Sequence, residues 1–303
     1  MTALLKKICG CELELPGLTA TATKCARHGY AEIPAINWST LKVIGKSPRH
    51  YQHALTTPRT DTPALSFGRI VHCAVFEPLE MPRRYVVAPE CDKRTTKCKK
   101  AWAAFVAANA GREIVDRDDY DRALLVGEAV RAHPVAASYL AAGVAESVCQ
   151  WTDADTGLRC KGRRDWVSTS RPAIVDLKTA RDLSPRAFAA AVARYEYDAQ
   201  LAFYGEGERV TTRQINPLPL VIIGVESVAP YDVGVFVLDD EATWRGMAIW
   251  RAYLKTLKQC RESGQWPGQY PAAVSLSLPM WAFPSDDGIE GMDLEFGEES
   301  TDG

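Results

Sequence analysis

The sequence lacks any apolar run approaching the roughly 18 residues that a membrane-spanning helix requires. Its first ten residues also lack the apolar centre of a secretion signal. No internal repeat is visible. We therefore expect a cytoplasmic protein without a membrane segment. With 303 residues and 47% hydrophobic content, the chain can bury a large core in one elaborated domain or two small ones.

Paired cysteine motifs are missing as well. The nine cysteines are an odd number, and none of them forms a Cys-x-x-Cys pair. Neither a disulfide framework nor a zinc ribbon is therefore indicated. We expect reduced, mostly buried thiols.

Basic residues are absent from the C-terminal tail. From position 285 onward the chain has eight acids and no lysine or arginine. Removing these eight from the 38 acids leaves 30 against 36 bases, so the rest of the chain is basic. A basic body suits a polyanionic partner. The acidic tail is typical of a disordered, solubilising segment, and a sharper hypothesis has it docking a basic partner protein.

An apolar, β-branched stretch at positions 173–180 is the most informative part of the sequence. It predicts a buried strand whose end carries the carboxylate of Asp176 and the ammonium of Lys178. Side chains alternate along a strand, so these two groups point to the same face. Burying either charge alone costs several kcal/mol, roughly, unless a counter-ion, metal or phosphate offsets it. The pair is therefore either an internal ion pair or part of a site.

Two strands upstream each contribute another acid. Asp165 lies in a segment that can pair antiparallel with the first strand through the loop at 168–172, and Glu146 opens the preceding strand. A turn at 153–157 connects those two segments. Three carboxylates beside one lysine form a set of oxygen ligands suited to Mg²⁺ or Mn²⁺, with Lys178 placed to orient or deprotonate a water.

A helix downstream and several bases complete the candidate site. Ser184 and Pro185 fit a helix start, and Gln200 and Tyr204 lie four residues apart on one face of the helical region that follows. Both can reach one phosphate or water. Arg163 and Arg164, which precede Asp165, are candidate contacts to a nucleic-acid backbone. A run of five bases in eight residues, at 93–100, includes Lys93, Arg94 and Lys97. It fits contact with a DNA backbone and a solvated loop equally well.

Outside this region the pattern predicts mainly scaffold. Helices are expected at 38–55, with Ser39 as N-cap and a break at Ser47-Pro48, and at 65–76, 101–110, 118–132 and 241–261. Gly68 is expected to allow close helix approach. A hairpin with its turn at 230–231 is expected to join strands at 218–228 and 232–238. Positions 1–37 show no sustained period, so the expected division is a lead-in segment, one domain at 38–284 and a disordered acidic tail at 285–303.

In their order along the chain, these elements resemble the core of the PD-(D/E)xK nucleases, in the RecB-like arrangement that ends with a Gln-x-x-x-Tyr motif. A closer resemblance is to the RecE-like (exonuclease VIII type) double-strand DNA exonucleases of phage recombination. It spans roughly positions 38 to 209, with a weaker echo at 278–281. It also rests on Ser47–Tyr51 (Ser-Pro-Arg-His-Tyr) and on Ser66–His72 (Ser-Phe-Gly-Arg-Ile-Val-His) followed by Glu77-Pro78.

The resemblance implies an α/β, restriction-endonuclease-like core in which helices flank a central mixed sheet. It implies a metal-dependent exonuclease acting on linear double-stranded DNA ends, a ring-shaped homo-oligomer and a single-strand annealing protein as partner. Iron–sulfur RecB-like nucleases carry three cysteines after the core, whereas only Cys260 follows it here, so no cluster is expected. The implied metal ligands are Asp165, Asp176, the Leu177 carbonyl, Glu146 directly or through water, and His72; Lys178 orients the water, and Gln200 and Tyr204 position a phosphate.

Two other interpretations stay open at this point. One is a RecB-like repair nuclease acting on single strands or flaps. The other is a non-catalytic DNA-end-binding protein on the same fold, although such a protein would be expected to have lost an acid or the lysine, and all are present.

Overall fold

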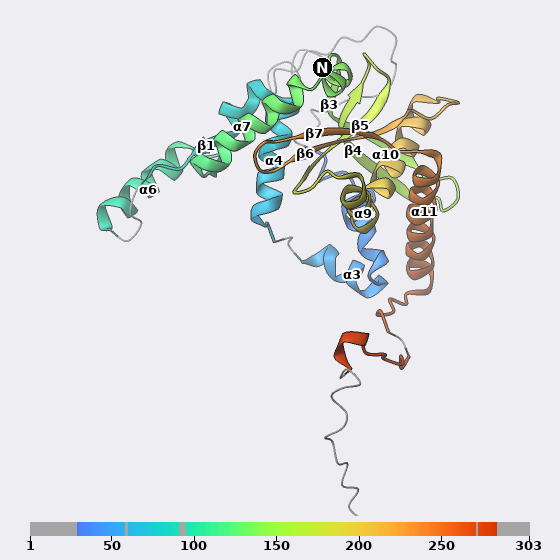
Figure 1. The fold of residues 1–303 in the computed structure, drawn as a ribbon. Helices are drawn as coiled ribbons and strands as arrows, with labels where there is room; N and C mark the ends of the chain where they lie inside the picture. The colour runs from blue at the N-terminus through green and yellow to red at the C-terminus, as the bar shows by residue number, and fades with distance from the viewer. Residues whose placement is uncertain (1–28, 58–59, 91–94, 271, 284–303) are drawn as a thin grey trace, which may run out of the picture.

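A five-stranded mixed sheet forms the centre of the molecule (Figure 1). The computed structural model describes residues 29–57, 60–90, 95–270 and 272–283. The sheet has the order β3-β4-β5-β6-β7. All neighbouring pairs are antiparallel except β5 and β6, which are parallel. The strands are β3 (Gly143–Thr152), β4 (Arg159–Ser168), β5 (Ala173–Ala180), β6 (Leu220–Glu226) and β7 (Val233–Val237).

The chain connections explain this order. Short turns join β3 to β4 and β4 to β5, so these strands are antiparallel, as predicted. The β5–β6 pair is parallel and therefore needs a crossover, which α9 (Pro185–Tyr195) and α10 (Tyr197–Thr212) supply. The predicted hairpin at 230–231 is confirmed, because β6 pairs antiparallel with β7.

Helices cover both faces of the sheet, and each face has its own apolar core. On one face α4 (Pro63–Phe76) and α7 (Arg117–Ala132) pack against Val175 and Leu177 of β5. On the other face α10 and α11 (Asp240–Ser263) pack against Ile174 and Ile222. Alternate residues of β5 thus enter opposite cores, which is why its apolar run is nearly continuous in sequence. The expected α/β fold with helices flanking a central mixed sheet is confirmed.

Short helices before α4 pack beside α11. They are α2 (Trp38–Leu41), the 3₁₀ turn η1 (Lys42–Gly45) and α3 (Pro48–Thr56). The break at Ser47-Pro48 is confirmed, since Ser47 accepts a hydrogen bond from the His50 amide and caps α3. The predicted N-cap of the first helix is wrong: Asn37 accepts the Thr40 amide and occupies that role, two residues before Ser39.

The close approach of two helices also occurs at a different glycine from the one predicted. A Cβ at Gly68 would meet nothing within 4 Å. At Gly127 of α7, by contrast, a Cβ would lie 3.0 Å from the Ala74 carbonyl oxygen of α4. A glycine inside a helical pattern shows that space is available but not which neighbouring helix uses it.

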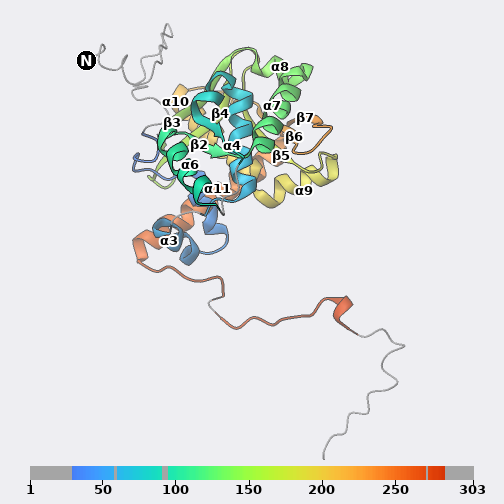
Figure 2. The same ribbon diagram turned by 90° about the vertical axis from the view of Figure 1, so that its left-hand side faces the viewer.

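Two parts of the chain extend away from the central sheet. One contains α6 (Thr96–Ala108) with the two-stranded sheet of β1 (Tyr85–Val87) and β2 (Glu113–Val115) (Figure 1). The other is the segment that follows α11, which leaves the body in both views (Figure 2). Cys98 in α6 is disulfide-bonded, so the expectation of reduced thiols is wrong at that position. The remaining elements are η2 (Pro78–Glu80), α5 (Met81–Arg84), α8 (Pro134–Leu140) and η3 (Met280–Ala282).

Among the described residues, no helix is both long and apolar enough to cross a membrane. The acidic tail from 285 onward and most of the 1–37 lead-in segment lie outside the described residues.

Candidate metal centre

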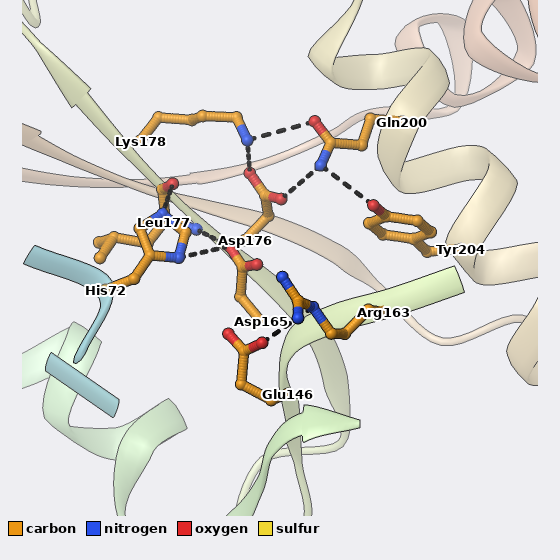
Figure 3. Close-up of polar contacts among 9 residues, drawn as sticks. All are labelled: His72, Glu146, Arg163, Asp165, Asp176, Leu177, Lys178, Gln200 and Tyr204. Atoms are coloured by element: carbon orange, nitrogen blue, oxygen red, sulfur yellow. Dashed lines mark hydrogen bonds and ion pairs between the residues drawn. The ribbon is translucent and has the colours of Figure 1, made fainter. Parts of the chain in front are cut away.

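Three acids meet at adjacent positions on β3, β4 and β5. Glu146 stands opposite Asp165, because the ladder pairs on either side of them are in register. The β4–β5 ladder ends one pair before Asp165 and Asp176, and its register brings those two residues together. Directly opposite residues of neighbouring strands lie about 5 Å apart, so a carboxylate on each strand forms a cluster. Figure 3 shows Asp165 between Glu146 and Asp176, with the Asp176 carboxylate turned to Lys178 and Gln200.

The regular alternation of β3 and β4 is interrupted where the acids lie. Ala145 packs against the α4-side core, whereas Cys149, an even number of residues later, packs against the α10-side core. Trp166 and Cys160 on β4 divide between the two cores in the same way. Glu146 has a φ of 52°, a left-handed conformation that costs a non-glycine residue on the order of 1 kcal/mol. The alternation is therefore interrupted at Glu146 and Asp165, and the side chains of these two acids enter the space between the two cores.

His72 reaches this space from α4, on the other side of the sheet from α10. Its Nε2 lies 3.0 Å from the Leu177 carbonyl oxygen, and its Nδ1 lies 3.4 Å from Asp165 Oδ2. The same Asp165 oxygen accepts the Leu177 amide at 3.0 Å, which replaces a ladder bond where β4 and β5 separate. Ligand atoms of His72, Glu146 and Asp165 all lie within 4.8 Å of one another. The structure thus brings His72 to the acids, as predicted.

The donor set fits a divalent ion. The 3.0 Å contact between His72 Nε2 and the Leu177 carbonyl oxygen is a hydrogen bond, and an ion bound by both atoms would take the place of its proton. Carboxylate and carbonyl oxygens suit Mg²⁺ or Mn²⁺, and an imidazole favours Mn²⁺ among these two. His72, Glu146, Asp165 and the Leu177 carbonyl would hold such an ion, and Asp176 flanks them.

Asp165 carries the strongest electrostatic signal among the acids. Burial raises the pKa of its carboxyl to about 6, and Asp176 pushes in the same direction, while His72, Lys178 and the Leu177 amide act against them. A buried carboxylate beside another acid is costly unless a cation joins it. The raised pKa therefore indicates a site that favours a proton or a metal ion.

Asp176 and Lys178 form a hydrogen-bonded chain with α10. Lys178 Nζ lies 2.5 Å from Asp176 Oδ2 and donates to Gln200 Oε1 at 3.2 Å. Gln200 Nε2 in turn donates to Asp176 Oδ1 at 3.2 Å and contacts the Tyr204 hydroxyl at 3.4 Å (Figure 3). Burial opposes the charge of Lys178, but Asp176 and Asp165 outweigh it, so the net pKa of the ammonium is raised. Burial also raises the pKa of the Tyr204 hydroxyl well above its usual range.

The predicted basic contacts have different placements. Arg163 is half-exposed, and its Nε lies 2.9 Å from Glu146 Oε2. Arg164 is buried, pairs with Glu208 of α10 and donates to Ser147, so we withdraw it as a contact to a nucleic-acid backbone. The prediction took both arginines beside Asp165, but side chains alternate along a strand, so only Arg163 takes the outward position. Lys93, Arg94 and the Lys97 side chain lie outside the described part of the structure.

Three residues near the acids were missed at the sequence level. Tyr30 lies beside Arg163 and raises the pKa of Tyr204, and burial raises its own pKa. Lys161 holds it by donating to the Tyr30 carbonyl at 2.6 Å and to the Ile33 carbonyl at 2.9 Å. The Tyr197 ring lies 4.6 Å from Lys178 Nζ. Tyr197 was recognisable, because it precedes Gln200 by three residues on the same helical face; Tyr30, 131 positions from Lys161, carried no local signal.

Comparison with known proteins agrees with this geometry. Residues 37–273 match the family model of the PDDEXK-like domain of unknown function (DUF3799). Among solved structures, the chain is similar to a protein from Eubacterium rectale named "Putative exonuclease", with a TM-score of 0.56 and 14% sequence identity. The similarity covers 91% of this chain and 100% of that one, and at this identity it shows the fold. No curated protein is significantly similar in sequence.

Proposed function

Because the chain belongs to the family of PDDEXK-like domains of unknown function (DUF3799), we propose that it is a metal-dependent deoxyribonuclease that hydrolyses phosphodiester bonds. The observation that carries the proposal is the convergence of Glu146, Asp165 and Asp176 beside Lys178 at one break in the sheet. A structural ion pair alone would explain Asp176 and Lys178. It would not explain why two further ligands, one in a left-handed conformation, meet there.

The residues divide into those that hold metal and those that act on the substrate. His72, Glu146, Asp165, Asp176 and the Leu177 carbonyl would hold divalent ions. Such ions supply a water of lowered pKa and stabilise charge on the leaving oxygen. Lys178 remains protonated at neutral pH because the pKa of its ammonium is raised. Its ammonium can therefore donate a hydrogen bond that orients the attacking water.

Gln200 and Tyr204 position this lysine and the substrate. Gln200 contacts both Lys178 and Asp176, so it fixes the ammonium relative to the acids. The raised pKa of Tyr204 keeps its hydroxyl protonated and able to donate to a phosphate oxygen.

The finer proposal is an Mg²⁺-dependent exonuclease for linear double-stranded DNA in phage-type recombination. It is supported by the resemblance to RecE-like enzymes and by the name of the similar Eubacterium rectale protein. The same resemblance supports two proposals on assembly: a ring-shaped homo-oligomer and a single-strand annealing partner. The mass of the purified protein in solution, compared with 33.3 kDa for one chain, tests the first. Co-purification with a single-strand annealing protein expressed together with this chain tests the second.

The function is tested on end-labelled linear duplex with Mg²⁺ or with chelator. We expect mononucleotides to be released only with Mg²⁺, and closed circular duplex to stay intact. Asp176→Ala, if it remains folded, should lose this activity. Preferential digestion of single strands or flaps would favour a RecB-like repair nuclease. Tight binding of duplex ends without cleavage in any divalent metal would favour a non-catalytic end-binding protein and refute the proposal.

A further inference from the structure

Arg163 is the one exposed base among the described residues that directly contacts an acid of the candidate metal centre. Its Nε lies 2.9 Å from Glu146 Oε2, and its side chain is 44% exposed, compared with 18% for Glu146. The carboxylate is therefore partly shielded from water, while the guanidinium faces the solvent. Figure 3 shows Arg163 approaching the acids from β4. A side-chain cation thus neutralises one of the acids of the candidate metal centre.

The guanidinium occupies Glu146 Oε2, one of the two oxygens that this carboxylate offers to a metal ion. Two like charges this close near a protein surface repel each other, and the double charge of a divalent ion strengthens the repulsion. The Glu146 side chain is only 18% exposed, so its surroundings leave it little room to move. Arg163, by contrast, is long and exposed, so it is the partner that can move.

A second partner for Arg163 lies nearby. The guanidinium carbon is 5.4 Å from the centre of the Tyr30 ring, within the range of a cation–π contact. Tyr30 is itself held in place, because Lys161 donates to its carbonyl and lies 4.6 Å from its ring centre. The ring offers a fixed surface along which Arg163 can leave Glu146 without losing every contact.

We propose that Arg163 is a positioning residue that alternates between Glu146 and a DNA phosphate, and so couples substrate binding to metal loading. Without metal it neutralises Glu146. When a divalent ion takes Glu146, the guanidinium is released toward solvent and binds a backbone phosphate. This inference rests on the proposed nuclease function and deepens it. Because coupling between two ligands is reciprocal, a metal ion that strengthens DNA binding must itself be bound more tightly when DNA is present.

The chain offers a matched control pair. Arg209 and Glu206 of α10 form an ion pair whose side chains are 45% and 16% exposed, close to the values for Arg163 and Glu146. This pair contributes no ligand to the candidate metal centre. Arg209→Gln and Glu206→Gln therefore measure how the loss of one charge away from the candidate metal centre changes Mn²⁺ and duplex affinity.

The first experiment is calorimetric titration of the DNA-free protein with Mn²⁺. We expect Arg163→Gln to bind Mn²⁺ about tenfold more tightly than the parent, and Arg209→Gln to bind it as the parent does. Unchanged or weaker binding by Arg163→Gln would overturn the inference.

The second experiment measures affinity for a short duplex in EDTA, in a double-mutant cycle. Glu146→Gln should release Arg163 and tighten duplex binding about tenfold, whereas Glu206→Gln should change it less than twofold. In the Arg163→Gln background, Glu146→Gln should have less than a twofold effect. A full tenfold gain in that background would mean that only repulsion from Glu146 was removed, and would refute the proposed alternation.

The salt dependence of binding gives an independent measure. The slope of log affinity against log salt should be steeper by about one in Glu146→Gln than in the double variant, since one more phosphate is neutralised. A parent that binds neither duplex nor Mn²⁺ would overturn the nuclease proposal and this inference together. A parent that binds both with no coupling through Arg163 would overturn only the inference.

Discussion

At the scale of single residues, Asp165 and Lys178 show how environment assigns roles to common side chains. Asp165 is pushed toward its neutral form by burial, while Lys178 is held charged by the acids around it. Both pKa values are raised, but the causes differ. Burial raises that of the Asp165 carboxyl, and the neighbouring acids raise that of the Lys178 ammonium against the effect of burial. A carboxyl that favours a cation and an ammonium that stays protonated are what a metal-assisted hydrolase needs.

Asp165→Asn is expected to stabilise the metal-free protein at pH 8. The folded-state pKa of about 6 exceeds the ordinary 3.8, so folding favours the protonated acid, and this contribution is lost as pH rises through 6. A shift of about two units, discounted for partial exposure, corresponds to about 2 kcal/mol. Urea unfolding in EDTA should show this gain at pH 8 and its steady decline between pH 6 and pH 4. The control is Asp155→Asn in the exposed turn between β3 and β4, which should leave the free energy of unfolding unchanged. A gain in stability that is equal at every pH, or that the control also shows, would contradict burial of the charge as the cause.

Lys178→Met is expected to lower the cleavage rate by about 10²–10⁴-fold, the range typical of a positioned proton-transfer or water-orienting group. Mn²⁺ binding should persist, because the lysine is not a ligand. Cleavage rate and calorimetric metal binding are measured on the same preparation, with Lys255→Met on the exposed side of α11 as control. Loss of metal binding together with activity would show that Lys178 instead holds the acids in place.

At the scale of elements, α10 is the helix on which the geometry of the site depends. It presents Gln200 and Tyr204 to β5, and its buried Glu208 pairs with Arg164 of β4. Its other side packs closely on α11, where a Cβ at Gly246 would lie 2.6 Å from the Asp198 carbonyl oxygen. Because that contact is with backbone, α10 and α11 have no side chain that can yield between them. Movement of α11 is therefore transmitted to the site.

Gly246→Ala is expected to destabilise the protein by about 1–3 kcal/mol, since the added methyl group overpacks a backbone contact. Activity should also fall, because α10 carries Gln200. Gly68→Ala in α4 is the matched control: its Cβ would meet nothing, so better helix propensity should stabilise the protein by about 0.5–1 kcal/mol. Chemical unfolding of both variants measures the contrast. Similar effects of the two substitutions would refute the close contact at Gly246.

At the scale of the whole molecule, the candidate site lies where the two cores meet. His72 comes from the helix layer on one face and Gln200 from the layer on the other, while the acids come from the sheet between them. A ligand that joins these groups connects both cores through the sheet. Ion binding should therefore be visible as global stabilisation.

Mn²⁺ at 100 times its dissociation constant is expected to stabilise the folded protein by about 2.7 kcal/mol. The increase in melting temperature at a fixed Mn²⁺ concentration should be larger at pH 8 than at pH 5, because protons compete with the ion for Asp165, whose pKa is about 6. Scanning calorimetry with and without the ion tests this. Asp165→Asn should lose most of the shift, and a pH-independent shift in the parent would place the ion elsewhere.

The sequence alone determined the strands that carry the acids and the order in which they pair. Short turns allow only antiparallel neighbours, and alternation along β5 puts Asp176 and Lys178 on one face. These are local rules, so residues a few positions apart suffice to apply them. The helices expected at 65–76 and 241–261 followed from their apolar pattern, and the structure places them at Pro63–Phe76 and Asp240–Ser263.

Only the tertiary structure decided what happens where local rules fail. The interruption at Glu146 and Asp165 depends on both cores taking side chains from the same strand, which local alternation does not predict. Tyr30 reaches the site through hydrogen bonds to a lysine far along the chain, which no short window of sequence contains. Local sequence patterns thus predict which residues carry the chemistry of the site. The enclosure of the site and the placement of Arg163 beside Tyr30 depend on contacts between distant segments.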